Sequence, residues 1–238
     1  MNSRPLWKGG SFYQYDPHGA EARWCSESDA VWNKVRKKRP GLRSQIARFV
    51  PVADRRRAVL TELGRARVAF RDVSRANDSR TVIACLVPPE VFLTNTSPYL
   101  AFIDGDEMVQ AACLGIMNSL PFDWQARRFV EIHVNFFILE GLVVPWLDDE
   151  NFEAVARCAA RLSAVDDRFA DFAKATGVRV GPLGPSERQR LLVEIDALVA
   201  HAWNLTPDDL AVMFDDFTTD AVSEGYRTDL LARLVELR

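Results

Sequence analysis

The apolar positions of this 238-residue chain change their spacing about two thirds of the way along. In the first part they form short runs rich in β-branched residues, of which the clearest, at 82–87, is ended by Pro88 and Pro89. Such a run predicts a buried strand. We expect further elements in this part as strands at 12–15, 68–71, 99–103 and 135–139, and as helices at 58–64, 108–119 and from Pro121 to about residue 128.

Beyond residue 147 the apolar residues recur every three or four positions, which is typical of amphipathic helices. Asp148 or Asp149 can cap the first of these helices. Ser186 begins a later helix with a capping box, and Thr206 precedes a proline that suits the first turn of the next. The last helix is expected at 229–237. The clearest apolar stripe lies in the helix after Ser186 and consists of Leu191, Ile195, Leu198 and Ala202.

Together these patterns predict an α+β fold. A mixed, β-rich domain is expected over residues 1–147, and a helical docking or spacer region over 148–238. The apolar fraction of 48% and the charged fraction of 26% are those of an ordinary soluble protein. We expect neither a membrane span nor a signal peptide. The four cysteines are widely spaced, so we expect a cytoplasmic protein without a zinc site or disulfides.

The net charge of −3 conceals an asymmetry along the chain. Residues 1–86 hold 18 Lys+Arg and 8 Asp+Glu, a balance of +10, whereas residues 87–238 hold 12 and 25, a balance of −13. A basic part joined to an acidic part suggests a polyanion on one side and protein or solvent on the other. Alternatively, the two parts neutralise each other.

Three segments place basic side chains in settings that suit a phosphate backbone. Lys8 stands beside two glycines, which allow close approach of a backbone, and Lys37 and Lys38 belong to a basic run flanked by tryptophans. The third segment, 69–89, leads a polar turn into the buried strand and carries Arg71, Arg75, Asn77 and Arg80. The alternative is a solvated turn whose arginines pair with acids elsewhere.

The sequence FRDVSRANDSRT within this third segment resembles a motif in the C-terminal target-recognition region of type IIG restriction–modification enzymes and of phage-growth-limitation-type adenine-specific DNA methyltransferases. Three further blocks match that region in the same order. They are PLWKGGSFYQY at 5–15, LGIMNSLPFDW at 114–124 with HVNFFIL at 133–139, and LVEIDALVAHAWNL at 192–205. The four blocks span nearly the whole chain and belong to the recognition half of the family, so the resemblance implies binding of duplex DNA.

The motifs of the family's catalytic half are missing from the sequence. An amino-methyltransferase needs a polar residue, two prolines and an aromatic residue in succession, and the nearest match is Val87-Pro88-Pro89-Glu90. A glycine-rich loop for S-adenosylmethionine and a nuclease Glu-x-Lys are also absent. We therefore expect no catalytic residue, cofactor or metal. Catalysis is expected from a methyltransferase, from another defence-complex subunit or from a missing N-terminal domain.

These observations favour a sequence-specific DNA recognition module that lacks its own catalytic motifs. The DNA-binding residues are expected to be Lys8, Lys37, Lys38, Arg75, Asn77 and Arg80, with Arg71 and Asn135 structural or close to DNA. His133 is expected in the core or in a groove. Two rival functions remain open: a divergent metal-dependent nuclease that uses the acidic pairs Asp148-Asp149, Asp208-Asp209 and Asp215-Asp216, and a protein-interaction module of a defence complex.

Overall fold

The computed structural model describes residues 3–19, 24–27, 63–102 and 106–238. Its strands form two three-stranded sheets, in the orders β2-β1-β5 and β4-β3-β6. The pairs within them are antiparallel except for β1 with β5, which is parallel. The strands are β1 (Ser3–Trp7), β2 (Trp24–Glu27), β3 (Arg67–Phe70), β4 (Ala84–Val87), β5 (Phe92–Leu93) and β6 (Tyr99–Leu100).

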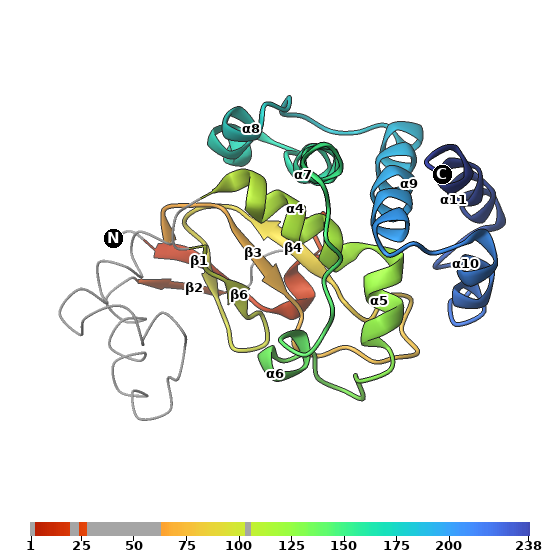
Figure 1. Ribbon diagram of the computed structural model, residues 1–238. Helices are drawn as coiled ribbons and strands as arrows, with labels where there is room; N and C mark the ends of the chain where they lie inside the picture. The colour runs from red at the N-terminus through yellow and green to blue at the C-terminus, as the bar shows by residue number, and fades with distance from the viewer. Residues whose placement is uncertain (1–2, 20–23, 28–62, 103–105) are drawn as a thin grey trace.

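Helices cover one side of these sheets and form the end of the molecule that contains the C-terminus (Figure 1). The order of α-helices is α4 (Glu107–Asn118), α5 (Leu120–Ala126), α6 (Phe136–Leu139), α7 (Asp149–Ser163), α8 (Ala170–Thr176), α9 (Pro185–Ala202), α10 (Pro207–Phe214) and α11 (Glu224–Glu236). Two short 3-10 turns are η1 (Gly9–Ser11) and η3 (Asp167–Phe169). The fold is α+β with a helical C-terminal part, as the apolar spacing predicts.

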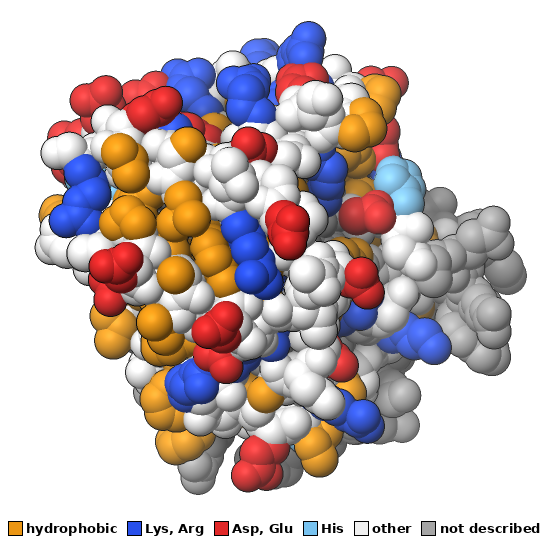
Figure 2. Space-filling model, turned by 90° about the vertical axis from the view of Figure 1, so that its right-hand side faces the viewer, with side chains coloured by type: hydrophobic (Ala, Val, Ile, Leu, Met, Phe, Trp, Pro, Cys, Tyr) orange, Lys and Arg blue, Asp and Glu red, His pale blue; other side chains and the backbone are white. Residues whose placement is uncertain are grey.

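The core is continuous from the sheets into the C-terminal helices. One buried cluster joins β3 and β4 to α4, α7 and α9, and a second joins α5 to α9, α10 and α11. Helix α9 serves both clusters, because Leu191, Ile195 and Leu198 enter the first while Val193 and Ala197 enter the second. Residues on both sides of position 147 therefore share one core, and the division into domains at 1–147 and 148–238 stays a prediction. Figure 2 shows hydrophobic, acidic and basic side chains mixed over the face formed by the C-terminal helices.

Most elements lie where the apolar spacing places them, and capping residues explain several boundaries. Asp148 caps α7 by accepting a hydrogen bond from Asn151 N, and Thr206 forms a capping box with Asp209 at the start of α10.

The structure differs from the sequence prediction at two helix starts. Helix α9 begins at Pro185 without the capping box expected from Ser186, and α11 begins at Glu224, before residue 229.

Two of the predicted strands are wrong. Residues 136–139 form α6, because the Asn135 side chain accepts a hydrogen bond from Ile138 N and turns the apolar run into a helix. Residues 12–15 follow η1 and end at Tyr15, whose φ of 55° is incompatible with a strand. The helix expected at 58–64 lies almost wholly outside the described residues.

Gly115 sets the close approach of α4 and α7, and replacing it with alanine is expected to destabilise the protein. A Cβ atom at this position would lie 2.7 Å from Val155 Cγ1. Overpacking of a core costs about 1–3 kcal/mol, whereas the gain in helix propensity is about 1 kcal/mol. We expect a net loss in the free energy of unfolding, measured by urea denaturation. The matched control is Gly225→Ala in α11, where a Cβ would meet nothing within 4 Å and where we expect no loss.

Candidate nucleic-acid interface

The stretch that carries the predicted arginines forms the connection from β3 to β4, residues 71–83, which we call the β3–β4 loop. The loop leaves and re-enters the sheet at a hydrogen bond from Arg71 N to Ile83 O (2.9 Å). Next to it runs segment 132–134, which is joined to it by Ser74 N to Ile132 O (3.0 Å) and Val134 N to Asp72 O (2.7 Å). Figure 1 shows the loop beside α5.

Buried polar side chains hold the end of the loop that enters β4. Asp123, fully buried in α5, accepts hydrogen bonds from the backbone N–H groups of Thr81 and Val82 at 2.8 and 2.5 Å. The Gln14 side chain donates to Val82 O (2.8 Å). The Asn118 side chain both accepts from Ala84 N and donates to Ala84 O, each at 2.9 Å. These side chains replace the hydrogen bonds that a neighbouring strand would otherwise make to residues 81–84.

Arg127, at the C-terminal end of α5, holds the outer part of the loop. Its Nε lies 3.1 Å from Asp123 Oδ2, and its side chain is only 5% exposed. Its Nη2 donates to the carbonyl oxygens of Asp78 (2.8 Å) and Ser79 (3.1 Å), and its Nη1 donates to Ala76 O. The guanidinium also lies over the Phe217 ring, 4.1 Å from its centroid. One nearly buried cation therefore fixes three carbonyl groups of the loop backbone through charge-assisted hydrogen bonds.

Two of the predicted arginines point into the molecule. The Arg71 side chain donates from Nε to Phe12 O (3.0 Å) and lies over the Tyr13 ring, and burial lowers the pKa of its guanidinium. Arg80 lies over the Phe217 ring, and its Nη1 atom is buried. Burial alone would lower the pKa of Arg80, but the charges of Asp196 and Asp123 raise it. The phosphate contact expected for Arg80 does not fit this position, because its charge faces two buried carboxylates.

Asp196 on α9 connects the C-terminal helices to this network. Its carboxylate accepts hydrogen bonds from Leu120 N (2.8 Å) at the start of α5 and from the Tyr226 hydroxyl (2.6 Å) on α11. Burial raises the pKa of Asp196, and the charge of Arg80 opposes that rise. The position of α5, which carries Asp123 and is capped at its C-terminal end by Arg127, is thus tied to α9 and α11.

The other predicted DNA-binding residues lie at the surface or outside the described residues. Arg75 and Asn77 are exposed in the β3–β4 loop, and the Arg75 side chain makes no hydrogen bond or ion pair with the described residues. Lys8 is exposed immediately before η1. Lys37 and Lys38 fall within 28–62 and are not described.

Two residues of the 133–139 block lie beside the loop at the surface. Asn135 caps α6, as described above. The side chain of His133 is 56% exposed, and its Nδ1 lies 3.1 Å from Asp72 Oδ2. The prediction that His133 belongs to the core is therefore wrong, and its placement in a groove stays a prediction. Of the apolar neighbours that suggested it, Val134 is buried but Ile132 is 53% exposed.

Residues from all four blocks of the resemblance meet at this loop. Gln14 belongs to the first block, Asn118 and Asp123 to the third, and Asp196 to the last. Each contacts the β3–β4 loop, the first residue of β4 or the helix that supports the loop. Their importance was missed in the sequence, although a lone Asp in the apolar sequence LPFDW was a signal that could have been followed.

The acidic pairs that a nuclease would use serve helix ends and surface contacts. Asp148 and Asp209 cap helices, and Asp216 accepts hydrogen bonds from Trp124 Nε1 (2.7 Å) and from Arg128. Among the described residues, no three His, Cys, Asp or Glu side chains lie close enough together to hold a metal ion. Within the same residues, every helix is too short or too polar to cross a membrane.

Comparison with known proteins gives one structural likeness. Neither a family model nor a curated protein matches the chain. Among solved structures, the chain is similar to the Type IIL restriction-modification enzyme MmeI in complex with DNA, with a TM-score of 0.44 and 15% sequence identity. The match covers 96% of this chain and 31% of that chain, so this chain spans about a third of the length of the enzyme it matches.

Proposed function

We propose that this chain is a sequence-specific duplex DNA recognition module of a restriction–modification or phage-defence methyltransferase, and that the β3–β4 loop is its contact surface. One observation carries the proposal. A loop held from within by Asp123 and Arg127 presents Arg75 and Asn77 to solvent, and the Arg75 side chain is unpaired among the described residues.

The chemistry of these two side chains suits DNA. A free guanidinium binds phosphate or the O6 and N7 atoms of guanine, and an asparagine amide pairs with the N6 and N7 atoms of adenine. Because the loop backbone is already fixed, binding does not incur the entropy cost of ordering it. Lys8 and the undescribed Lys37 and Lys38 would add phosphate contacts. Arg71 and Arg80 act as structural supports in this proposal.

Catalysis lies elsewhere in this proposal, on a methyltransferase or another defence-complex subunit, or on a domain that this sequence does not contain. The nuclease alternative makes a distinct prediction, namely that the purified chain cleaves DNA when a divalent cation is added. One member of each acidic pair already has a structural partner, which disfavours that alternative.

Arg75→Ala is expected to weaken binding to duplex DNA of any sequence and to flatten the dependence of log K on log salt by about one unit. The reason is that one phosphate contact releases about one counterion. Fluorescence anisotropy with a labelled duplex across a salt series measures both quantities. A loss of affinity confined to one base pair, about 1–3 kcal/mol, would instead identify Arg75 as a base-reading residue.

Arg190→Ala is the matched control for this experiment. Arg190 is also an exposed arginine without a hydrogen-bond or ion-pair partner among the described residues, and it lies in the first half of α9. Figure 1 shows α9 apart from α6. Its replacement should leave affinity and salt slope unchanged. Equal binding by the parent, Arg75→Ala and Arg190→Ala would show that the β3–β4 loop is not the DNA-binding surface.

A further inference from the structure

The connection from α5 to α7 exposes an unusual number of large apolar side chains. Most of the exposed large hydrophobic residues in the described part of the chain lie on it, and Phe137 on α6 is 86% exposed. The exposed set on this connection is Phe129, Ile132, Phe136, Phe137, Val143, Val144 and Trp146. A group of large apolar side chains exposed together usually marks a contact surface, whereas single exposed apolar residues are common on any protein.

The backbone that carries Phe137 is fixed by several contacts. Asn135 caps α6, and Glu140 N donates to Phe136 O (2.9 Å) to close the turn. Phe136 packs edge-on against Phe70 of β3, with ring centroids 5.4 Å apart. Ile138 packs against the main core cluster. Since its neighbours are anchored, the Phe137 ring projects from a rigid turn rather than from a mobile tail.

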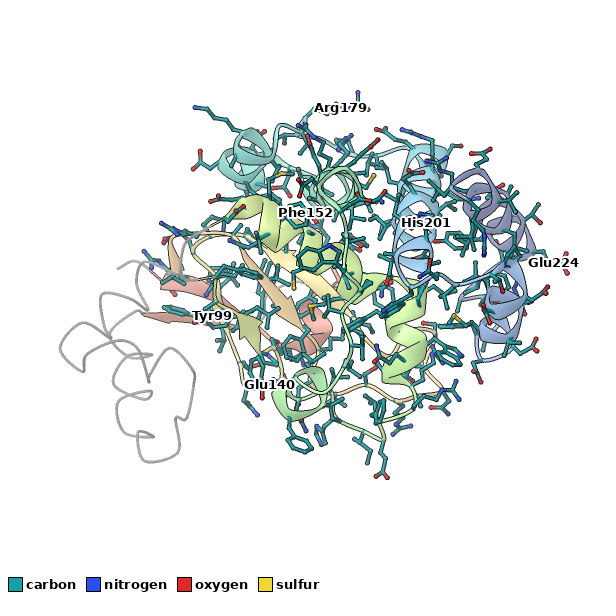
Figure 3. All side chains as sticks on the ribbon, in the orientation of Figure 1. Tyr99, Glu140, Phe152, Arg179, His201 and Glu224 are labelled. Carbon is teal, nitrogen blue, oxygen red and sulfur yellow. The ribbon has the colours of Figure 1, made fainter. Side chains whose placement is uncertain are left out.

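The same turn is joined to the β3–β4 loop. Segment 132–134, which leads into α6, forms the hydrogen bonds to Asp72 and Ser74 described above. Phe137 is therefore three residues beyond a segment paired directly with the loop that presents Arg75. Figure 3 shows Glu140, which follows α6, at the edge of the molecule opposite Arg179. A ligand held by the loop would thus be close to the turn.

The charge of the turn restricts what it can contact in DNA. Glu131 is exposed and precedes the exposed ring in sequence, and carboxylates repel the phosphate backbone. An apolar ring gains nothing from phosphate but gains from stacking on a base or from entering a base step. From this geometry we propose that Phe137 inserts into a base step of the duplex bound by the β3–β4 loop and unstacks it. The inference rests on the proposed DNA-binding function.

The test uses duplexes selected by the purified wild-type chain from a randomised pool. The adenine analogue 2-aminopurine, whose fluorescence rises when it is unstacked, is then placed at each position of a selected duplex in turn. We expect the wild-type complex to show a rise at one step. At saturating protein, Phe137→Ala should lose that rise, and its affinity for the duplex should fall about tenfold. Phe137→Leu should lose less, because an aliphatic wedge keeps part of the contact.

Two variants separate failure of this inference from failure of the proposed function. Arg75→Ala should bind more weakly yet keep the fluorescence rise once saturated, because it removes a backbone contact and not the wedge. Val235→Ala is an exposed apolar control, since Val235 is 60% exposed but lies on α11, outside this connection. It should match the wild type in both readouts. Two outcomes would overturn the role of Phe137 and leave the proposed function standing. One is wild-type binding that depends on Arg75 but gives no fluorescence rise at any position. The other is a fluorescence rise that survives in Phe137→Ala. A wild-type chain that binds no DNA would overturn the proposed function.

Discussion

Replacing Asp123 by alanine is expected to lower the free energy of unfolding by about 3–5 kcal/mol, because it breaks a buried ion pair and leaves its partners unsatisfied. The carboxylate accepts two backbone hydrogen bonds from Thr81 and Val82 and pairs with Arg127. Without it, two buried N–H groups and a nearly buried cation lose their acceptor. The Arg127 contacts to Asp78 and Ser79 are expected to loosen as well, so amide hydrogen exchange should quicken in the β3–β4 loop.

Urea denaturation followed by circular dichroism measures the loss of stability. The control is Asp216→Ala, because Asp216 also pairs with an arginine, Arg128, but both side chains are 40% exposed or more. Exposed pairs contribute about 0–1 kcal/mol, so this variant should stay close to the parent. If Asp123→Ala unfolded at the same urea concentration as Asp216→Ala, Asp123 would not be the support that the geometry describes.

Leu198→Asp is expected to cost several kcal/mol and to prevent stable folding near room temperature, since it places an unpaired charge in a dry core. Leu198 is 3% exposed and lies in the cluster that joins α9 to α4 and α7. Soluble yield and the thermal unfolding midpoint are the measurements. Should the aspartate variant fail to express, Leu198→Ala still reports on the same contact, with an expected loss of about 2–5 kcal/mol.

Val212→Asp provides the comparison for this helix bundle. Val212 is 64% exposed on α10, so the same substitution there places the charge in water. Its effect should stay within about 0.5 kcal/mol. A thermal midpoint for Leu198→Asp equal to that of Val212→Asp would mean that α9 does not form the core of the bundle.

The helices of this protein were predictable because their apolar residues repeat over many positions. The stripe Leu191, Ile195 and Leu198 is buried as its spacing requires. Short helices and strands were harder to predict, because they contain too few residues to show a repeat. In 135–139 the residues FFIL favour a strand, whereas the capping side chain of Asn135 favours a helix. The segment forms the helix α6. β1 and β2 were not predicted, because each is a short strand whose partners are distant in sequence.

The candidate site was predictable as a segment but not as a set of roles. The sequence places Arg71, Arg75 and Arg80 in one polar turn, yet only Arg75 points into solvent without a partner among the described residues. Arg80 turns inward because Asp123 and Asp196, which are 43 and 116 positions further along the chain, meet beneath the turn. The direction in which a side chain points depends on such long-range partners. Residue type and local spacing carry no information about which distant residues those partners are.

The side chains beneath the β3–β4 loop also affect how the protein behaves at high concentration. β4 is a terminal strand of its sheet, and a bare strand edge offers a template on which a strand of another molecule can add. Here Asn118 occupies both backbone groups of Ala84, while Asp123 and Gln14 occupy those of Val82. The amide and carboxylate groups thereby block the start of this edge, at residues 82 and 84, to intermolecular strand pairing. The residues that shape the loop thus also oppose aggregation through this part of the sheet edge.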